Sequence, residues 1–294
     1  MPKRIAVVYG GWSSEAEISR KSGKAVAKAL KNLGYEVFEL ELNRNIASEL
    51  TEIKPDLVFP ALHGKPGEDG TFQGLLEIMG IPYAGEGVKT SALCMDKDWT
   101  KRILLSAGID TPDWWVVKRG ETFEVDRFGE FPLVVKPSEE GSSVGLSVVK
   151  NKVELLNSIN ALLTKVEKVI VEKFVEGREY TVGFVKNKFF KPLEIVPKKG
   201  IYDFEAKYTA GLTDFIPVEN EEIEKKLLNL AEKVVKTLDI ENICRIDFRF
   251  DEKNGKFFVL EVNTMPGMTE TSLLPKMASL SGYSFEELID LLIH

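Results

Sequence analysis

The stretch Arg4–Gly34 decides the fold, and it reads RIAVVYGGWSSEAEISRKSGKAVAKALKNLG. It opens with a short apolar, β-branched run, and after a Gly-Gly pair an amphipathic helical pattern covers Glu15–Leu33. Ser14 and Glu17 have the spacing of a capping box at the start of this helix. Gly34 follows the last turn, where a left-handed residue commonly ends a helix. The stretch therefore predicts a β-strand that leads directly into an α-helix.

The same alternation of strand and helix continues through the first third of the chain. The expected elements are the strands Glu36–Leu42, Asp56–Leu62 and Ile81–Ala84 and the helices near Ile46–Ile53 and Thr71–Met79. Alternating strands and helices fold as a parallel, doubly wound sheet. Ligands of such sheets bind at the carboxyl ends of the strands, so the segment Gly10–Glu15 lies where a substrate would bind. Because this segment lacks the GxGxxG spacing, it predicts no dinucleotide site.

Beyond this first unit the pattern changes to strand, loop and strand. A helical stretch at Ser91–Ser106 separates the two patterns, and we place a domain boundary near residue 93. The elements expected after it are the strands Phe131–Lys136, Leu146–Val149 and Val169–Phe174, a helix near Lys152–Thr164, the strand pair Tyr180–Val185 and Phe189–Ile195, a helix at Glu221–Leu238 and a closing helix from Ser284. A long polar loop between Pro197 and Pro217 has the length of a lid.

Composition argues against several classes of protein. The 294 residues carry 46 acidic and 39 basic side chains, which gives a formal charge of −7. No basic block is present in the sequence, so we expect no nucleic-acid partner. No apolar run approaches the roughly 18 residues that cross a bilayer, and no signal segment precedes the first strand, so we expect a soluble cytoplasmic protein without a membrane partner. Cys94 and Cys244 suit reduced core thiols.

Two strand-like runs late in the chain predict a β-hairpin. They are Cys244–Phe250 and Phe257–Asn263, and the Asn254-Gly255 pair between them is a strong turn signal. If the turn is centred on Asn254, Asp247 lies opposite Glu261. Side chains alternate between the two faces of a strand, so these two carboxylates share one face of the hairpin and the apolar residues of the same strands share the other.

The polar face of this hairpin has the composition of a magnesium site. By the same register Arg245 lies opposite Asn263, beside the facing pair of Asp247 and Glu261. Two opposed carboxylates repel each other unless a cation lies between them, and carboxylate and amide oxygens suit an Mg²⁺ ion that bridges phosphates. The alternative is a solvated polar strand face without a metal. The turn Asn263–Thr269 after the second strand offers backbone N–H groups to an oxyanion.

The loop Lys136–Gly145 has the composition of a phosphate-binding loop. A lysine stands at the end of a strand, and glycines and serines follow it closely. Such a loop offers backbone N–H donors to phosphate oxygens with little steric hindrance, although it is not a Walker A motif. Gly141, Ser143 and Gly145 also match the G-x-S-x-G of a hydrolase nucleophile, but a strand-like run follows where that motif needs a helix. A plain surface loop is the other alternative.

Seven parts of the sequence, in order, resemble the D-alanine:D-alanine ligases of the ATP-grasp superfamily. They are Gly10–Glu15, Ala61–Gly64 with Gly67–Gly70, Met95–Lys97, Lys136–Gly145, Tyr202–Tyr208, Arg245–Asp247 and Glu261–Thr269. The resemblance implies an α/β fold of the ATP-grasp type, in which a doubly wound parallel-sheet domain precedes two α+β domains that enclose ATP. The corresponding units are 1–93, 94–175 with the glycine- and serine-rich loop, and 176–294 with the lid loop and the metal site.

The activity that the resemblance implies is the ATP-dependent joining of two D-alanines to D-alanyl-D-alanine for peptidoglycan synthesis. In that reaction the γ-phosphoryl group of ATP activates the carboxylate of one D-alanine, and the amino group of the second attacks the acyl phosphate. The implied assembly is a homodimer. The alternatives are another ATP-grasp ligase that joins a carboxylate to an amine or to D-lactate, and a nucleotide-binding protein without catalytic activity.

The resemblance also assigns a role to each matching residue. Two Mg²⁺ ions, which Mn²⁺ can replace, would bind to Asp247, Glu261 and Asn263. ATP would bind to Lys97, Lys136, Ser142, Ser143, Glu172, Lys173, Val175, Glu179 and Lys207. The two D-alanines would bind to Glu15, His63, Lys207 and Ser272. The catalytic residues would be Glu15, Ser142, Tyr208, Arg245 and Gly267.

Several of these residues also have a simpler structural explanation. Glu15 stands in the first turn of a helix, where a carboxylate stabilises the helix dipole by less than about 1 kcal/mol. Ser272 could cap a helix, and Lys207 could be a surface lysine. The segment from Glu172 to Glu179 could be a strand with an ordinary charged turn. Without the resemblance, these explanations are sufficient.

Overall fold

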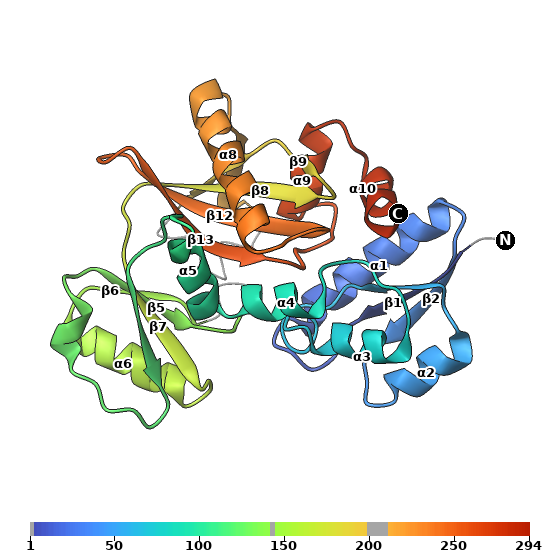
Figure 1. Ribbon diagram of the computed structural model, residues 1–294, viewed down its shortest axis with the longest axis horizontal. Helices are drawn as coiled ribbons and strands as arrows, with labels where there is room; N and C mark the ends of the chain where they lie inside the picture. The colour runs from blue at the N-terminus through green and yellow to red at the C-terminus, as the bar shows by residue number, and fades with distance from the viewer. Residues whose placement is uncertain (1–2, 142–144, 199–210) are drawn as a thin grey trace.

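The structure is a computed structural model that describes residues 3–141, 145–198 and 211–294. Figure 1 shows an N-terminal unit at one end of the molecule, a middle unit at the other and a C-terminal unit that lies against both. Each unit contains one of the three β-sheets that the described strands form. None of the described helices is long and apolar enough to cross a membrane.

The N-terminal unit is the parallel α/β sheet that the sequence predicts. Its elements are β1 (Arg4–Tyr9), α1 (Ala16–Asn32), β2 (Glu36–Glu41), α2 (Ile46–Ile53), β3 (Leu57–Pro60) and α3 (Thr71–Met79), with strand order β2-β1-β3. β1 pairs in parallel with both neighbours, and its residues 5–8 are fully buried, as expected of a central strand. The predicted strand Ile81–Ala84 is wrong. Only Tyr83 forms a bridge, to Val58, because Pro82 has no N–H to donate to a ladder.

The predicted capping box at the start of α1 is also wrong. Glu15 is the N-cap residue, and none of the described side chains caps the helix there. Ser13, rather than Ser14, turns inward: its hydroxyl donates to the backbone oxygen of His63 at 2.6 Å and accepts from the N–H of Glu15 at 3.2 Å. The loop after β1 is thereby tied to the loop after β3. The predicted end of the helix is confirmed, since Gly34 has φ +87°.

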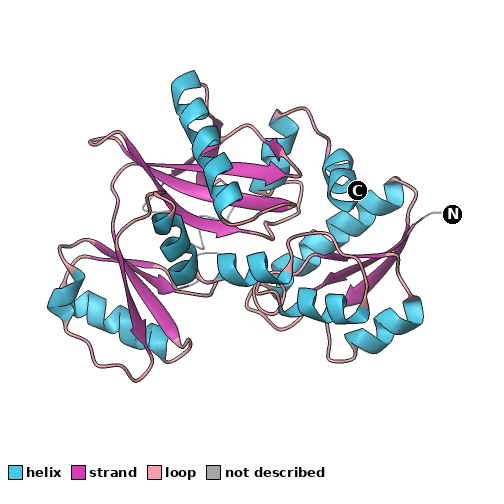
Figure 2. Ribbon diagram, viewed as in Figure 1, coloured by secondary structure: helices cyan, strands magenta, loops and turns pink. Residues whose placement is uncertain are grey.

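The middle unit is an antiparallel sheet with a helix on one face (Figure 2). Its elements are α4 (Val88–Met95), α5 (Lys97–Ser106), β4 (Trp114–Lys118), the 3₁₀ helix η1 (Val125–Phe128), β5 (Leu133–Pro137), β6 (Ser147–Val149), α6 (Lys152–Leu163) and β7 (Lys168–Lys173), with strand order β4-β7-β5-β6. The single helix predicted at Ser91–Ser106 is instead α4 and α5. They separate at Asp96, whose side chain accepts from the N–H groups of Asp98 and Trp99 and so starts a new helix. The sequence did not predict β4 or η1.

The C-terminal unit is an antiparallel sheet. Its elements are β8 (Arg178–Val185), β9 (Lys188–Phe189), β10 (Leu193–Pro197), β11 (Thr213–Pro217), α8 (Glu221–Thr237), β12 (Ile243–Asp251), β13 (Lys256–Asn263), α9 (Leu273–Leu280) and α10 (Phe285–Ile293), with order β11-β10-β8-β12-β13 and β9 beside β8. Leu227, Ala231 and Val234 of α8 pack in one core with β8 and β12. α9 and α10 share a core with β1 and α1, so they join the C-terminal unit to the N-terminal one (Figure 1).

The hairpin of β12 and β13 has the predicted pairing at its open end. Arg245 lies opposite Asn263, and Asp247 lies opposite Glu261. Nearer the tip the strands are one residue out of this register, and a β-bulge beside Asp247 accounts for the difference because it leaves Leu260 outside the ladder. The predicted register is therefore confirmed where the polar residues lie and wrong at the tip.

Candidate active site

A cleft of about 650 Å³ lies between the sheet of the middle unit and the sheet of the C-terminal unit. Its walls come from β5, β6 and β7 on one side and from β12 and β13 on the other. The predicted site residues that line it are Lys136, Glu172, Lys173, Val175, Glu179, Asp247 and Glu261. Apolar side chains, among them Val134, Leu146 and Leu260, complete the lining. This mixture of apolar walls and a few charged groups is typical of a small-molecule site.

Glu172, on β7, is held between two lysines in this cleft. Its Oε2 lies 2.8 Å from Nζ of Lys136, and its Oε1 lies 2.8 Å from Nζ of Lys101. Burial raises the pKa of Glu172, but the two ammonium groups outweigh this effect and hold the pKa below its usual value. Burial also lowers the pKa of Lys101 to about 8, so the pair is charged at neutral pH. The sequence analysis missed Lys101, whose signal was its spacing of one helical turn from Lys97.

Glu179, at the start of β8, is paired with an arginine from β12. Oε2 of Glu179 lies 2.9 Å from Nη2 of Arg249, which also donates through Nη1 to the backbone oxygen of Gly177 at 3.1 Å. The pair fixes the turn before β8 against the hairpin at one end of the cleft. The sequence analysis missed Arg249, although it follows Asp247 at the period of two that keeps both on one strand face.

The polar face of β12 carries a buried ion pair. Nε and Nη2 of Arg245 each lie 2.9 Å from one oxygen of Asp247, and Thr181 donates its hydroxyl to the same carboxylate at 2.7 Å. The opposite carboxylate, Glu261, has Nζ of Lys97 at 3.8 Å. Cations of the protein therefore provide part of the compensation that the sequence analysis assigned to a metal ion. Neither the pairing of Arg245 with Asp247 nor the contact of Thr181 was predicted.

The donor atoms on this face suit a hard cation. The described residues contain no cluster of three or more His, Cys, Asp or Glu side chains that could hold a metal, and the predicted set consists of two carboxylates and one amide. Oδ1 of Asn263 accepts from the N–H of Met265 at 2.8 Å, which orients the amide. All the donors are oxygens on one face of the hairpin, so they fit an Mg²⁺ ion that takes its remaining ligands from phosphates and water.

A second cavity, of about 380 Å³, adjoins the cleft because Glu261 lines both. Lys97, Glu140, Gly141 and Asn263 are among its other lining residues. Lys97 begins α5, and its Nζ donates to the backbone oxygen of Glu140 at 2.7 Å. The charged end of this lysine thus lies between the loop after β5 and the hairpin, where the two cavities meet.

Glu15 lies where the N-terminal unit meets the loop after β5. The residue is 4% exposed. A Cβ added to Gly141 would lie 2.7 Å from Oε2 of Glu15, and one added to Gly64 would lie 3.3 Å from the same atom. A side chain at position 141 would therefore displace the carboxylate of Glu15. The structure brings the predicted substrate carboxylate together with the predicted phosphate-binding loop, although the two are distant in sequence.

Two titratable side chains near Glu15 have strongly shifted pKa values. Burial lowers the pKa of His63 to about 4 against an opposing backbone hydrogen bond, and the charge of Arg245 adds to the lowering, so the imidazole is neutral at pH 7. Burial, with the charge of Glu15, raises the pKa of Glu68 to about 8, while the N–H of Gly64 donates to this carboxyl at 2.6 Å. Glu68 lines the second cavity and was not assigned a role from the sequence.

Gly267 and Ser272 lie together before α9. A Cβ added to Gly267 would lie 2.8 Å from Oγ of Ser272. Ser272 is the N-cap residue of α9, but among the described residues its hydroxyl makes no capping hydrogen bond. Instead Oγ accepts from the N–H of Thr269 at 3.2 Å and lies 2.8 Å from the hydroxyl of that residue. The predicted position of Ser272 at a helix cap is therefore confirmed, but its side chain makes no capping hydrogen bond among the described residues.

The remaining predicted residues lie outside the part of the chain that the structure describes. They are Ser142, Ser143, Lys207 and Tyr208. Their assigned roles stay predictions.

The class of the protein follows from the order and arrangement of its sheets. A parallel-sheet unit comes first in the chain, and two antiparallel sheets that enclose a cleft follow it. The lysines and carboxylates from both sheets face one cleft, and this arrangement is that of an ATP-grasp enzyme. The fold class predicted from the sequence is confirmed.

Comparisons with known proteins identify the family. The chain matches the family models "D-ala D-ala ligase N-terminus" over residues 40–86 and "D-ala D-ala ligase C-terminus" over residues 103–294. It is 52% identical over 291 residues to the D-alanine–D-alanine ligase of Aquifex aeolicus (strain VF5), with 99% of each chain covered. The structure is similar to that of D-alanine–D-alanine ligase from Bacillus anthracis complexed with ATP, with a TM-score of 0.86, 35% identity, and 99% of this chain and 96% of that chain covered. It is also similar to the VanG D-Ala:D-Ser ligase from Enterococcus faecalis, with a TM-score of 0.85, 30% identity, and 100% and 99% covered. The chain belongs to the D-alanine–D-alanine ligase family.

Proposed function

We propose that the protein joins two D-alanines into D-alanyl-D-alanine at the expense of ATP, as a step of peptidoglycan synthesis. The observation that carries the proposal is the junction of the two cavities at Glu261. A nucleotide in the larger cavity would extend its phosphates toward Lys97 and the smaller one, where an amino acid fits. The relative from Aquifex aeolicus is named for this activity, and the relative from Bacillus anthracis is a complex with ATP.

The reaction balances in two steps. A carboxylate oxygen of the first D-alanine takes the γ-phosphoryl group of ATP, and ADP leaves. The amino group of the second D-alanine then attacks the carbonyl carbon of the D-alanyl phosphate, loses a proton and forms the C–N bond, while the C–O bond to phosphate breaks. Catalysis of such steps consists almost entirely of positioning and of neutralising charge.

Two lysines and two loop serines supply contacts to the phosphates in this proposal. Lys97 and Lys136 bring two ammonium groups to the oxygens of the transferred phosphoryl group, where negative charge is spread. The contact of Lys97 with the backbone of Glu140 supports this role, because it places the ammonium group beside the phosphate-binding loop. The loop residues Ser142 and Ser143 close over the phosphates in this proposal.

Two Mg²⁺ ions, or Mn²⁺ in their place, fit the oxygens of Asp247, Glu261 and Asn263. When bound, they neutralise the charge of the nucleotide phosphates and of the group in transfer. The contribution of the chain is to present these oxygens in fixed positions. Arg245 and Thr181 orient Asp247, and this orientation supports its assignment as a metal ligand.

The nucleoside end of ATP occupies the part of the cleft nearest the hairpin turn, where Lys253 of the turn pairs with Glu176. In this proposal Glu172 lies near the adenine amino group, and the backbones of Lys173 and Val175 pair with the edge of the base. Glu179 accepts from the ribose hydroxyls. All four residues line the cleft, which supports the assignment over that of an ordinary charged turn.

The first D-alanine binds beside the N-terminal unit. Glu15 pairs with its ammonium group, and the neutral imidazole of His63 lines the same subsite. Arg245 and the N–H of Gly267 stabilise the oxyanion of the tetrahedral intermediate. The close approach of Glu15 to Gly141 supports this placement, because the activated carboxyl group must lie next to the loop that holds the phosphates.

The second D-alanine binds with its carboxylate against Ser272 and Lys207. The hydroxyl of Ser272 faces the loop before α9 rather than the helix. This orientation supports a contact with a carboxylate bound beside that loop. Tyr208, with Ser142 and Glu15, would close the site and exclude water, which would otherwise hydrolyse the acyl phosphate.

Phosphate release tests the proposed function. The enzyme would be given ATP and magnesium with D-alanine, L-alanine, or D-alanine mixed with D-lactate or D-serine, and the products would be weighed by mass spectrometry. We expect phosphate and D-alanyl-D-alanine from D-alanine alone. A mixed product with D-lactate or D-serine in excess over the dipeptide would favour the alternative ligases, for which the similarity to the D-Ala:D-Ser ligase is the supporting observation. Binding of ATP without phosphate release would refute the proposal.

The assembly and location of the protein are part of the same proposal. We infer a homodimer formed through the N-terminal unit, a cytoplasmic location, and the units 1–93, 94–175 and 176–294. Residue 93 lies within α4, so the proposed boundary between the first two units falls inside that helix. Analytical ultracentrifugation tests the dimer. Limited proteolysis tests the boundaries of the units, because we expect cleavage near residues 93 and 175.

A further inference from the structure

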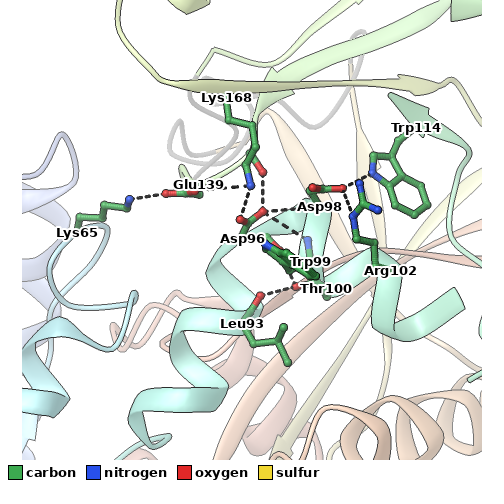
Figure 3. Close-up of polar contacts among 11 residues, drawn as sticks. Lys65, Leu93, Asp96, Asp98, Trp99, Thr100, Arg102, Trp114, Glu139 and Lys168 are labelled. Carbon is green, nitrogen blue, oxygen red and sulfur yellow. Dashed lines mark hydrogen bonds and ion pairs between the residues drawn. The ribbon is translucent and has the colours of Figure 1, made fainter. Parts of the chain in front are cut away.

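Asp96, between α4 and α5, is the centre of a polar cluster beside the phosphate-binding loop (Figure 3). Its Oδ1 accepts from the hydroxyl of Ser138 at 2.8 Å and from the N–H of Asp98 at 3.0 Å. Its Oδ2 pairs with Nζ of Lys168, the first residue of β7. The side chains of Asp96 and Lys168 are only 13% and 14% exposed, and Ser138 is fully buried. The cluster thus joins the start of α5 to the sheet of the middle unit.

The cluster is bonded directly to Lys97 and to the loop. The N–H of Lys97 donates to the backbone oxygen of Ser138 at 3.0 Å, and the N–H of Ser138 donates to that of Lys168 at 3.0 Å. Nζ of Lys97 donates to the backbone of Glu140 at 2.7 Å. The start of α5 is therefore joined to residues 138 and 140 of the loop by a closed ring of hydrogen bonds, which fixes their relative position.

Lys168 also compensates two carboxylates at this end of the loop, those of Asp96 and Glu139. Its Nζ lies 3.8 Å from Oε1 of Glu139, whose other oxygen pairs with Lys65 of the N-terminal unit (Figure 3). Burial raises the pKa of Asp96, but the hydrogen bonds from Lys168 and Ser138 outweigh it and keep the carboxyl ionised. Without Lys168, a buried carboxylate would stand uncompensated next to the residues that must receive a polyphosphate.

We propose that Asp96 and Lys168 form a positioning pair, which delivers Lys97 and the phosphate-binding loop to the nucleotide as one unit. Neither residue touches the substrates. They act through Lys97 and Ser138, by fixing the helix start against the loop and by cancelling negative charge there. The inference rests on the proposed contact of Lys97 with the phosphates. It adds a positioning role for Lys168, which lies outside every motif identified in the sequence.

Steady-state kinetics with ATP and D-alanine varied separately test the pair. We expect Lys168→Met to raise the KM for ATP about tenfold and to leave the KM for D-alanine within about twofold, because a charged contact near the phosphates is lost. Lys168→Arg keeps the charge and should restore the KM for ATP. Asp96→Asn keeps an acceptor for Ser138 but loses the ion pair, so we expect the KM for ATP to rise through the lost positioning alone, and no further rise in the double variant over Lys168→Met.

A matched control is Lys152→Met. Lys152 pairs with Asp126 on the exposed surface of the same unit, so its loss should leave both KM values unchanged. Urea unfolding of each variant accompanies the kinetics. If Lys168→Met folds poorly, Ser138→Ala removes only one hydroxyl of the cluster and should still raise the KM for ATP.

Three results would refute the role of the positioning pair. The first is that Lys168→Met changes the KM for ATP and the KM for D-alanine equally. The second is that the effects of Lys168→Met and Asp96→Asn add in the double variant, and the third is that neither Lys168→Met nor Ser138→Ala raises the KM for ATP. Lys97→Met distinguishes this failure from that of the proposed function. If Lys97→Met leaves the KM for ATP unchanged, the phosphate assignment itself is wrong. If it raises that KM while Lys168→Met does not, only the positioning pair is wrong.

Discussion

Replacing Lys101 by methionine should destabilise the protein strongly, because it removes one of the two cations that hold the buried carboxylate of Glu172. The side chains of Lys101 and Glu172 are 2% and 3% exposed, with Nζ and Oε1 2.8 Å apart. Breaking a buried pair by removing one partner costs about 3–5 kcal/mol. Lys136 still compensates Glu172, which reduces the cost. Two further acceptors, Oγ1 of Thr111 at 2.5 Å and the backbone oxygen of Pro112 at 3.2 Å, lose their donor, which increases it.

We therefore expect Lys101→Met to lower the free energy of unfolding by about 3 kcal/mol, measured by urea unfolding followed by circular dichroism. Methionine keeps most of the side-chain volume, so the loss reports charge rather than a cavity. The double variant Lys101→Met with Glu172→Gln should not recover this loss, because it leaves Lys136 without its carboxylate partner. The exposed-pair variant Lys152→Met serves as the control and should change the free energy by less than about 1 kcal/mol. A cost below about 1 kcal/mol for Lys101→Met, or a double variant as stable as the unsubstituted protein, would refute the reasoning.

Three further predictions concern the metal face, the buried imidazole and the lid. Glu261→Gln should lower kcat about 100-fold or more in the phosphate-release assay, whereas Glu252→Gln at the exposed hairpin tip should not; equal rates in the two variants would contradict the metal assignment. The pKa of His63 is about 4 when folded and 6.5 in the unfolded chain, so the unfolded state binds the proton first as the pH falls. Stability should drop by about 3 kcal/mol between pH 6.5 and 4, and His63→Gln should flatten this part of the pH profile of urea unfolding. Lys207→Ala and Tyr208→Phe should each lower the yield of dipeptide per ATP below one by admitting water; an unchanged yield in either variant would defeat the lid assignment.

The sequence predicted most helices and strands, and the errors have identifiable physical causes. The helix Ser91–Ser106 was predicted as one element because its apolar period runs on without a Gly or Pro. The break at Asp96 arises because its carboxylate satisfies the free N–H groups of a new helix and pairs with Lys168, which is distant in sequence. Likewise Ser13 replaces Ser14 in the first loop because it finds an acceptor at His63. In each case a contact from another segment overrode a local pattern.

The register of the β12–β13 hairpin was predicted correctly at one end and wrongly at the other. Its polar pairs were predicted correctly from the Asn254-Gly255 turn, yet the pairing at the tip is shifted by one residue. The bulge at Leu260 restores the register before the polar residues are reached. A bulge inserts one residue without changing the alternation of hydrophobic and polar side chains on the partner strand, so period-two patterning does not reveal it. The correct prediction at Asp247 and Glu261 thus depended on two offsets that cancel.

In three buried charge pairs of the candidate site, the sequence analysis marked the carboxylate as part of a motif or as a site residue and missed its cationic partner. The pairs are Glu172 with Lys101, Glu179 with Arg249, and Asp96 with Lys168. A buried charge is tolerated only when a partner compensates it, so every recognised carboxylate in such a cleft requires a cation from somewhere in the chain. Which cation it is depends on the packing of elements distant in sequence, and one sequence does not contain that information. The residues that we propose to contact substrates were therefore found from the sequence, whereas the cations that hold the three paired carboxylates became visible only in the fold.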